Sequence, residues 1–173
     1  MRVVIGLGGN QGDVAAAFGW AAAALDETPG VAVEERSHLY LTEPVGPDQP
    51  RFLNAAIVVV SSLHPNALLR RCQELERICG RDRGVEPRWG PRVLDLDLLI
   101  SDGPVCRGPT LELPHPRLAE RAFALVPAAD VAPDWVHPLC GRTVAELAAA
   151  AVAAAPDAVR RCGGWPAGGG PLQ

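Results

Sequence analysis

Residues 52–60 read Phe-Leu-Asn-Ala-Ala-Ile-Val-Val-Val, a run that is apolar at every position except Asn54. A continuous apolar run of this length, rich in β-branched residues, is typical of a strand that is covered on both faces. We therefore expect this strand at the centre of a sheet. Shorter apolar runs predict three further strands, at residues 2–7, 31–40 and 93–100.

Two helices are predicted between these strands. Asp13 can cap the first, which follows a 3.6-residue apolar period until Pro29 ends it. The second begins at Pro65 and ends at Gly80. The order of elements in the first hundred residues is therefore βαββαβ, which predicts a ferredoxin-like α/β (α+β) fold. In this fold a mostly antiparallel sheet carries its helices on one face.

The second half of the chain has weaker signals. A short helix is expected after His115, and Thr143-x-x-Glu146 is a capping box that opens an alanine-rich helix. Residues 161–173 are rich in glycine and proline and show no packing pattern, so we expect a disordered tail there. Residues 1–160 are predicted to form one domain.

Composition excludes several kinds of site. All 16 basic residues of this 173-residue chain are arginine and none is lysine, so a G-x-x-x-x-G-K-[ST] phosphate loop and Schiff-base chemistry are impossible. Five cysteines without a C-x-x-C pair predict neither a disulfide framework nor a zinc site. A net charge of −4, no signal peptide and no membrane-length apolar run predict a cytoplasmic protein without nucleic-acid or membrane partners.

Charge is distributed unevenly along the chain. Residues 70–92 contain seven arginines and four acidic residues, a local charge of +3, so the rest of the chain carries −7. Directly afterwards, residues 94–98 read Leu-Asp-Leu-Asp-Leu, which places the leucines on one face of a strand and Asp95 and Asp97 on the other. Strict alternation would place Arg92 on the leucine side, opposite the aspartates, whereas a bend at Gly90 and Pro91 would redirect it, and the sequence leaves both open.

Two neighbouring carboxylates on a rigid strand suit Mg²⁺ that bridges to substrate phosphates. The alternative is an ordinary amphipathic strand with a solvated face. The adjacent arginine cluster favours the first interpretation, because guanidinium groups bind phosphate oxygens while carboxylates bind metal.

The glycine-rich turn at Gly6-x-Gly8-Gly9-Asn10 follows a strand and precedes a helix. A dinucleotide-binding G-x-G-x-x-G motif starting at Gly6 would need a glycine at position 11, where the chain has glutamine. A tight strand–helix turn is the better interpretation.

Two further segments could contact a ligand. Pro114-His115-Pro116 holds a histidine at a helix start, where it could donate to an anion, with Arg117 and Arg121 on one helical face. Phe52 and Asn54 share a strand face, which would suit a flat heterocycle. Taken alone, a surface capping histidine and an asparagine satisfied by backbone are the better interpretations of these two segments.

Together these segments resemble the hydroxymethyldihydropterin pyrophosphokinases of folate biosynthesis, in order from about Gly8 to Leu147. The matching pieces are Gly8-Gly9-Asn10, Tyr40-x-Thr42-x-Pro44-x-Gly46, Gln49-x-x-Phe52-x-Asn54-Ala55, Glu76-x-x-x-Gly80-Arg81-x-Arg83, Arg88-Trp89-Gly90-Pro91-Arg92-x-x-Asp95-x-Asp97 and Pro114-His115-Pro116-Arg117-x-x-x-Arg121-x-Phe123. The two longest motifs are highly specific. The family's ferredoxin-like fold agrees with the predicted order of elements.

The resemblance implies that ATP donates its β,γ-diphosphoryl group to the hydroxymethyl oxygen of the pterin and that AMP is released. It implies Mg²⁺, two ions in expectation, bound by Asp95 and Asp97. The implied catalytic residues are Arg81, Arg83, Arg92, Asp95 and Asp97. The implied ATP-binding residues are Gln73, Glu76, Arg92, His115 and Arg121. The implied pterin-binding residues are Thr42, Pro44, Val45, Phe52, Asn54, Trp89 and Phe123.

One departure from the family pattern lies inside the motifs: Gly9 stands where the family usually has serine. The alternative function is a ferredoxin-like module that senses a nucleotide without turning it over. The expected partners are small molecules only, and the expected oligomeric state is a monomer.

Overall fold

The computed structural model describes residues 1–44, 48–81 and 90–165. Its first hundred residues follow the predicted order of strands and helices except that two strands, β2 and β3, stand where one was predicted, and further elements follow residue 101. The elements are β1 (Arg2–Gly9), α1 (Val14–Asp26), β2 (Val31–Arg36), β3 (Leu39–Thr42), β4 (Phe52–Ser61), α2 (Pro65–Ile78), β5 (Asp95–Ser101), β6 (Cys106–Arg107), β7 (Glu112–Leu113), the 3-10 turn η1 (Leu118–Glu120), α3 (Ala122–Val131), α4 (Val144–Ala154) and β8 (Val159–Gly163).

The apolar run at residues 52–60 forms the centre of the main sheet, as predicted. Strand order is β5-β1-β4-β3-β8, and β2 also pairs with β4. Every pairing in this sheet is antiparallel, and β1 is paired with β4 along the whole length of β1. The residues of β4 from Asn54 to Val59 are buried because both faces of the sheet are covered.

The prediction of one strand over residues 31–40 is wrong. The run is broken at Ser37 and His38 into β2 and β3, and both pieces pair with β4. The buried Ser37 hydroxyl accepts a hydrogen bond from the Ala56 backbone N–H at 2.8 Å, and the Ser37 N–H donates to the Ala56 carbonyl at 2.9 Å. The Ser37 hydroxyl therefore takes the place of a backbone carbonyl as the acceptor for the Ala56 N–H.

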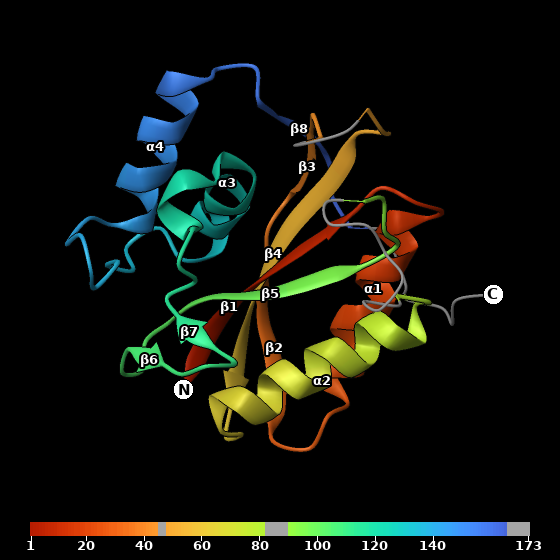
Figure 1. Ribbon diagram of the computed structural model, residues 1–173, viewed down its shortest axis with the longest axis vertical. Helices are drawn as coiled ribbons and strands as arrows, with labels where there is room; N and C mark the ends of the chain where they lie inside the picture. Colours follow the sequence, from red (N-terminus) through yellow and green to blue (C-terminus); the bar gives the residue numbers. More distant parts are fainter. Residues whose placement is uncertain (45–47, 82–89, 166–173) are drawn as a thin grey trace.

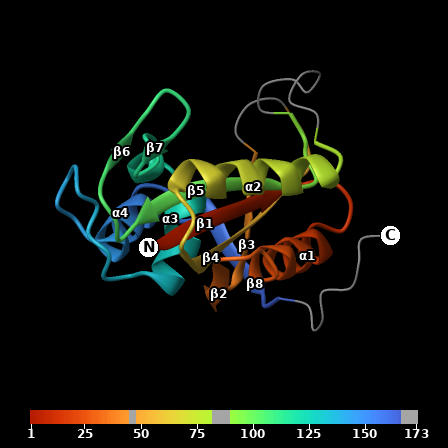
Figure 2. The ribbon, with the colours of Figure 1, turned by 90° about the horizontal axis from the view of Figure 1, so that it is seen from below.

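Helices cover both faces of the sheet, which corrects the expectation that they lie on one (Figure 1). In Figure 2, α1 and α2 again lie apart from α3 and α4. The first pair packs with alternate residues of β1 such as Ile5, whereas the second pair packs with Val4 and Val58 from the opposite face. The expectation held for the first hundred residues, since α3 and α4 come later in the chain.

The predicted helix starts at Asp13, Pro65 and Thr143 are confirmed, but the helix start predicted after His115 is wrong. There a 3-10 turn, η1, comes first, α3 begins only at Ala122, and Arg117 and Arg121 cap these elements and do not share a helical face. The Asp13 side chain accepts from the Ala16 N–H, and the capping box at Thr143 and Glu146 is complete. Helix α2 begins at Pro65, but its capping side chain is His64. No helix in the described ranges is long and apolar enough to span a membrane.

The predicted domain boundary at residue 160 falls inside strand β8. This strand pairs with β3, and beyond it the Trp165 indole N–H donates to the Ser37 carbonyl at 2.7 Å. The Trp165 ring also packs against Phe18, with 6.1 Å between ring centroids. The chain is therefore part of the folded domain as far as Trp165, and residues 166–173 lie outside the described part.

Candidate active site

A cavity of about 990 Å³ lies on the face of the sheet that carries α3. Its floor is formed by β1, β4 and β5, and Gly6 and Gly8 of β1 contribute only backbone there. A Cβ atom at Gly8 would lie 3.4 Å from Asn54 Oδ1 and 3.9 Å from the Asp95 Cβ. Because β1 carries no side chain at this point, the hollow extends without interruption between Asn54 and Asp95.

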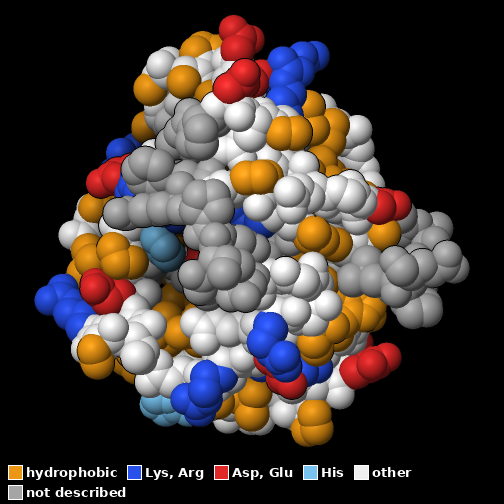
Figure 3. All heavy atoms as spheres, turned by 45° about the vertical axis from the view of Figure 1, so that its right-hand side comes forward, with side chains coloured by type: hydrophobic (Ala, Val, Ile, Leu, Met, Phe, Trp, Pro, Cys, Tyr) orange, Lys and Arg blue, Asp and Glu red, His pale blue; other side chains and the backbone are white. Residues whose placement is uncertain are grey.

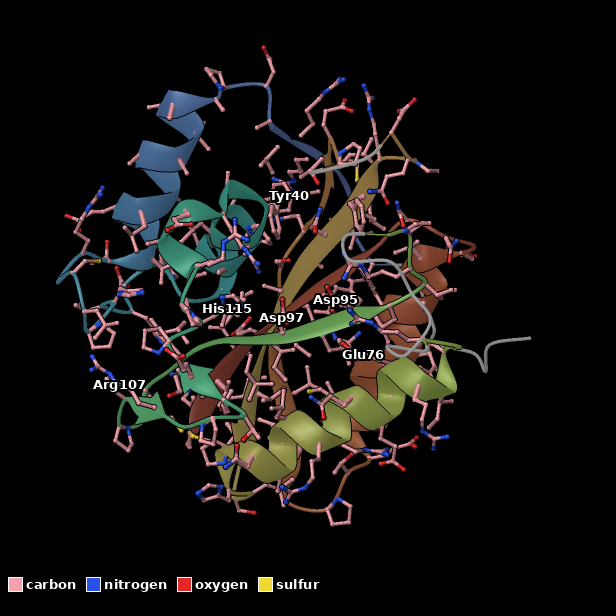
Figure 4. All side chains as sticks on the ribbon, in the orientation of Figure 1. Tyr40, Glu76, Asp95, Asp97, Arg107 and His115 are labelled. Carbon is pink, nitrogen blue, oxygen red and sulfur yellow. The ribbon has the colours of Figure 1, made fainter. Side chains whose placement is uncertain are left out.

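Asp95 and Asp97 both face this cavity, as their alternation with leucines predicts. Leu94, Leu96 and Leu98 are buried in the core on the α1/α2 side. Both carboxylates project from β5 beside His115 (Figure 4). The pair lines the cavity together with arginines, which is the arrangement that the first interpretation expects, and the metal-binding role of the two aspartates stays a prediction.

The position of Arg92 follows the redirected chain and not strict alternation. Its Nη1 donates to Asp95 Oδ2 at 3.0 Å, so its side chain lies on the aspartate side. Strand β5 begins only at Asp95, and alternation does not apply to the residues before it. The backbone N–H of Arg92 donates to the side-chain oxygen of Asn10 at 2.9 Å, which fixes the turn that redirects the chain.

Arg81 links two acidic side chains. Its Nη1 lies 2.7 Å from Glu76 Oε1 and also contacts Asp95 Oδ1. The almost fully buried Glu76 carboxylate accepts in addition from the Leu96 backbone N–H at 2.8 Å. Glu76 thus holds the end of α2, β5 and Arg81 together, and it does not line the cavity. Gln73 lies exposed on α2, also outside the cavity lining.

His115 and Arg121 bring two nitrogen atoms to one point of the cavity wall. The backbone N–H of Arg117 donates to His115 Nδ1 at 3.1 Å, so the neutral imidazole carries its proton on Nε2. Nε2 lies 3.5 Å from Arg121 Nη1, which in turn lies 3.6 Å from Asp97 Oδ2. Two N–H donors that converge in this way suit an anionic oxygen between them.

The surroundings of His115 keep its ring neutral near pH 7. Burial lowers the pKa of His115, and the neighbouring positive charges of Arg121 and Arg117 lower it further. Burial also lowers the pKa of Arg121, while the Asp97 carboxylate acts in the opposite direction. An arginine remains protonated throughout, so an anion that binds here meets a fixed positive charge and a neutral donor.

The same two arginines lie against aromatic rings. The Arg92 guanidinium carbon is 5.6 Å from the centroid of Phe52, and that of Arg121 is 5.6 Å from the centroid of Phe123. Each guanidinium therefore pairs with an aspartate through a nitrogen atom and lies over a phenylalanine ring. Arg92 and Arg121 join the charged end of the cavity to its aromatic end.

Asn54 is held by a side chain rather than by backbone. Its Nδ2 donates to Thr42 Oγ1 at 2.8 Å, and both residues are buried in the cavity wall. Gly8 sits directly opposite Asn54 in the β1–β4 ladder. The interaction fixes the orientation of the amide, which leaves its carbonyl oxygen as an acceptor toward the cavity.

Helix α3, which follows Arg121 and carries Phe123, is fastened to β3 by Asp130. This carboxylate accepts from the backbone N–H of His38 at 3.0 Å and from the Tyr40 hydroxyl at 2.8 Å. Burial raises the pKa of Asp130, but hydrogen bonds from His38 and Tyr40 outweigh this and lower it below the usual value. Burial and Asp130 raise the pKa of Tyr40 to about 12.

The structure brings most of the predicted site residues to this cavity. Those that line it are Thr42, Pro44, Phe52, Asn54, Arg81, Arg92, Asp95, Asp97, His115, Arg121 and Phe123. Gln73 and Glu76 do not line it. Val45, Arg83 and Trp89 lie outside the described residues, so their predicted roles stay predictions.

Several residues of the site carried no assigned role in the sequence prediction. Asn10 binds the Gln49 side chain at 3.1 Å, the Pro50 carbonyl at 3.0 Å and the Arg92 backbone. Only its place in the glycine-rich turn could have indicated this. Arg117, Ala158 and Val159 also line the cavity. The last two come from a segment for which the sequence offered no motif.

The chain packs closely against Gly9, the position at which the resemblance leads us to expect a serine. A Cβ atom at this position would lie 2.3 Å from the Val93 carbonyl oxygen and 2.9 Å from Val14 Cγ1. The backbone approach between β1 and the chain before β5 therefore leaves no room for a serine side chain here.

The donor set of the site fits a magnesium ion bound mainly through phosphate. Among residues 1–44, 48–81 and 90–165, no three His, Cys, Asp or Glu side chains lie close enough together to hold a metal ion by themselves. Mg²⁺ requires only one or two carboxylates when substrate phosphates and water complete its shell. Asp95 and Asp97 supply two such oxygen donors on one strand.

Comparison with known proteins agrees with this geometry. Residues 4–133 match the family model described as 7,8-dihydro-6-hydroxymethylpterin-pyrophosphokinase. The chain is 46% identical over 149 residues to the 2-amino-4-hydroxy-6-hydroxymethyldihydropteridine pyrophosphokinase of Methylorubrum extorquens, covering 86% of this chain and 92% of the relative. It is 40% identical over 144 residues to the enzyme of that name from Synechocystis, covering 83% and 73%.

Solved structures agree in fold. A triple mutant of Plasmodium falciparum HPPK-DHPS matches with a TM-score of 0.67 and 15% identity, over 90% of this chain and 44% of that longer chain. At this identity the likeness supports the ferredoxin-like fold alone. The family match and the closely similar bacterial relatives carry the assignment further: the chain belongs to the 7,8-dihydro-6-hydroxymethylpterin-pyrophosphokinase family.

Proposed function

We propose that this protein transfers the β,γ-diphosphoryl group of ATP to the hydroxymethyl oxygen of 6-hydroxymethyl-7,8-dihydropterin, a step of tetrahydrofolate biosynthesis. The observation that carries the proposal is the junction formed by Arg92 and Arg121. Each of these guanidinium groups contacts an aspartate on one side and a phenylalanine ring on the other. A phosphate chain and a flat ring would meet there.

The charged end of the cavity is suited to ATP. His115, Arg92 and Arg121 would bind phosphate oxygens, and Arg81 would join them from the end of α2. The arginine–aspartate pairs neutralise each other before substrate binds. Binding would therefore exchange partners: phosphate oxygens take the guanidinium groups, and Asp95 and Asp97 become available to Mg²⁺. Gln73 and Glu76 would act from the second layer, with Glu76 positioning Arg81.

The aromatic end of the cavity is suited to the pterin. Phe52 and Phe123 would stack on the ring, because aromatic surfaces of this kind bind flat heterocycles. Asn54, fixed by Thr42, would read the hydrogen-bonding edge of the ring, and a purine without the matching pattern would leave these buried groups unpaired. Pro44 lines the same end, and Val45 and Trp89 are proposed to belong to it.

The chemistry is a displacement at the β-phosphorus of ATP. The substrate hydroxyl oxygen forms a bond to this phosphorus and releases its proton to water, the bond to the bridging oxygen of the α-phosphate breaks, and AMP leaves with that oxygen. Mg²⁺, two ions in our proposal, would supply charge neutralisation on the phosphates. Arg92 and Arg121 would hold the two substrates in line, which removes much of the entropic cost of bringing them together. Arg83 is proposed to help Arg81 exclude water.

The proposal extends to partners and location. We propose small molecules as the only partners, a monomer, and a cytoplasmic location. In the space-filling view, charged side chains of both signs are interspersed with hydrophobic ones over the visible face (Figure 3).

One assay separates this enzyme from a nucleotide-sensing module. The protein is incubated with ATP, reduced hydroxymethylpterin and Mg²⁺, and the nucleotide products are separated by chromatography. We expect AMP in equal amount to the pterin diphosphate. Formation of ADP instead of AMP would contradict diphosphoryl transfer, and nucleotide binding without any turnover would support the sensing module.

A further inference from the structure

The C-terminal strand β8 forms part of the wall of the candidate active site. Ala158 and Val159 line the cavity, although they lie 25 residues or more beyond the last position matched by the family model. Figure 1 shows β8 beside β3, at the edge of the sheet that α3 faces. The sequence motifs assign no function to Ala158 and Val159, although both residues line the cavity.

The register of β8 fixes the direction of the Val159 side chain. Val159 is paired with Thr42 in the antiparallel β3–β8 ladder. Directly opposed residues of such a ladder project to the same face, with Cβ atoms about 4.5–5.5 Å apart. Thr42 faces the cavity, where its hydroxyl accepts from Asn54. The isopropyl group of Val159 therefore lies beside the hydrogen-bonded pair of Asn54 and Thr42 at the aromatic end of the cavity.

The chain after β8 is held in place on the opposite face of the sheet, the face that carries α1. The Trp165 indole N–H donates to the Ser37 carbonyl, its ring packs against Phe18, and the Arg36 guanidinium lies 5.3 Å from the ring centroid. These contacts tie the chain after β8 to α1 and to the break between β2 and β3. Val159 is therefore a fixed part of the wall.

We propose that Val159 is a specificity-determining residue that closes the edge of the ring slot beside Thr42. This rests on the assignment of the aromatic end to the pterin. An apolar branched side chain beside a hydrogen-bonding pair limits how far a ring can extend at that edge. One methylene group in such a pocket changes discrimination between substrates by about tenfold or more.

The test uses two substitutions at Val159 in the full-length protein. Val159→Phe fills the edge of the slot, and Val159→Ala widens it. Binding of the pterin is followed by its fluorescence in the presence of a non-hydrolysable ATP analogue and Mg²⁺, and Kd of the ATP analogue is measured separately by calorimetry. We expect Val159→Phe to raise the pterin Kd at least tenfold and to leave the Kd of the ATP analogue within twofold.

Val159→Ala is tested with pterins that carry one additional methyl or ethyl group on the ring. We expect kcat/KM for at least one alkylated pterin, relative to the natural substrate, to rise about tenfold over the native protein. The matched control is Arg160→Phe. Arg160 is the exposed neighbour that pairs with Leu41, and its side chain faces away from the cavity. This variant keeps all constants within twofold.

The outcomes separate the two proposals. A native protein that forms AMP while Val159→Phe binds pterin as tightly as the native protein, and Val159→Ala shows no changed preference, would overturn the role of Val159 alone. A native protein that neither binds pterin nor forms AMP would overturn the proposed function and this inference together. Should Val159→Phe fail to fold by circular dichroism, Val159→Ala decides the question.

Discussion

The two ends of the cavity are built in different ways. At the charged end, Asp95 and Asp97 contact arginines, so this end is already neutralised by its own side chains. At the aromatic end, one hydrogen bond from Asn54 to Thr42 sets the orientation of the polar groups. At the charged end, the arginine–aspartate pairs would have to separate for the arginines to bind a ligand. At the aromatic end, the hydrogen-bonding groups of Asn54 and Thr42 keep their orientation when a ligand binds.

The two ends are not independent, because Arg92 and Arg121 contact both. Each guanidinium lies over a phenylalanine ring and pairs with an aspartate, so a substitution that moves it would affect both ends. Variants of the aspartates and of Asn54 should therefore separate the ends most cleanly, and a variant at their border should affect both.

The largest effect is expected for Asp97→Asn. The amide keeps the shape of the side chain but removes the negative charge that would hold Mg²⁺. Loss of one such electrostatic group lowers kcat by about a thousandfold. The rate of AMP formation measures this, and the pterin Kd stays within about threefold if the two ends are separate.

The matched control for Asp97→Asn is Glu112→Gln, the same change of charge at an exposed position of β7. It should leave kcat and both binding constants unchanged. A comparable fall in kcat for both variants would mean that net charge, rather than the position of Asp97, decides activity.

Asn54→Leu is expected to act at the aromatic end. It removes the amide that would read the pterin edge and leaves the Thr42 hydroxyl without its donor, at a cost of about 2 kcal/mol in pterin binding. The pterin Kd should rise about thirtyfold, while the Kd of a non-hydrolysable ATP analogue does not change. An equal loss of ATP binding would contradict the division into two ends.

Gly8→Ala tests the border between the two ends. The new methyl group would lie between Asn54 Oδ1 and the Asp95 Cβ, at ordinary contact distances of 3.4 and 3.9 Å, so the fold should accommodate it. We expect both the pterin Kd and the ATP-analogue Kd to rise, each about tenfold. A thermal melt within a few degrees of the native protein would show that the loss is local.

The smallest effect concerns the pH dependence of stability through His115. Its pKa in the folded protein is lowered from 6.5, chiefly by burial and then by Arg121 and Arg117. Above pH 6.5 the ring is neutral in both states. Below it the unfolded chain binds a proton that the folded protein resists, so the free energy of unfolding falls as pH falls.

Urea unfolding at pH 7.5 and 5.5 measures this effect in the native protein and in His115→Gln. The native protein should lose more stability than the variant over this interval, by no more than about 1.4 kcal/mol per pH unit. An identical loss in both proteins would assign the pH dependence to other groups, such as His137, whose pKa is also lowered by burial.

Local patterns predicted a large part of this molecule. The apolar run at 52–60 identified the central strand, and the leucine–aspartate alternation placed Asp95 and Asp97 on the open face, because both depend only on the two-residue period of a strand. The helix caps predicted at Asp13 and Thr143 are confirmed for a similar reason, because a capping side chain accepts a hydrogen bond from a backbone N–H only two or three residues further along the chain.

Contacts between distant segments decided the rest. Arg92 lies on the aspartate side because Asn10, some eighty residues earlier, holds its backbone. Glu76 supports Arg81 instead of lining the cavity because its carboxylate meets the Leu96 N–H. The break between β2 and β3 at Ser37 depends on the hydrogen bonds that Ser37 forms with the backbone of Ala56 in β4.

By itself, then, the sequence predicted a set of site residues of which most line the cavity, and it determined the face of β5 on which Asp95 and Asp97 lie. Only the tertiary structure decided that α3 closes the cavity from the second face of the sheet and that β8 supplies Val159 to its wall. The physical reason is that side-chain direction within a strand is local, whereas the choice of a neighbouring strand or helix depends on long-range hydrogen bonds and packing.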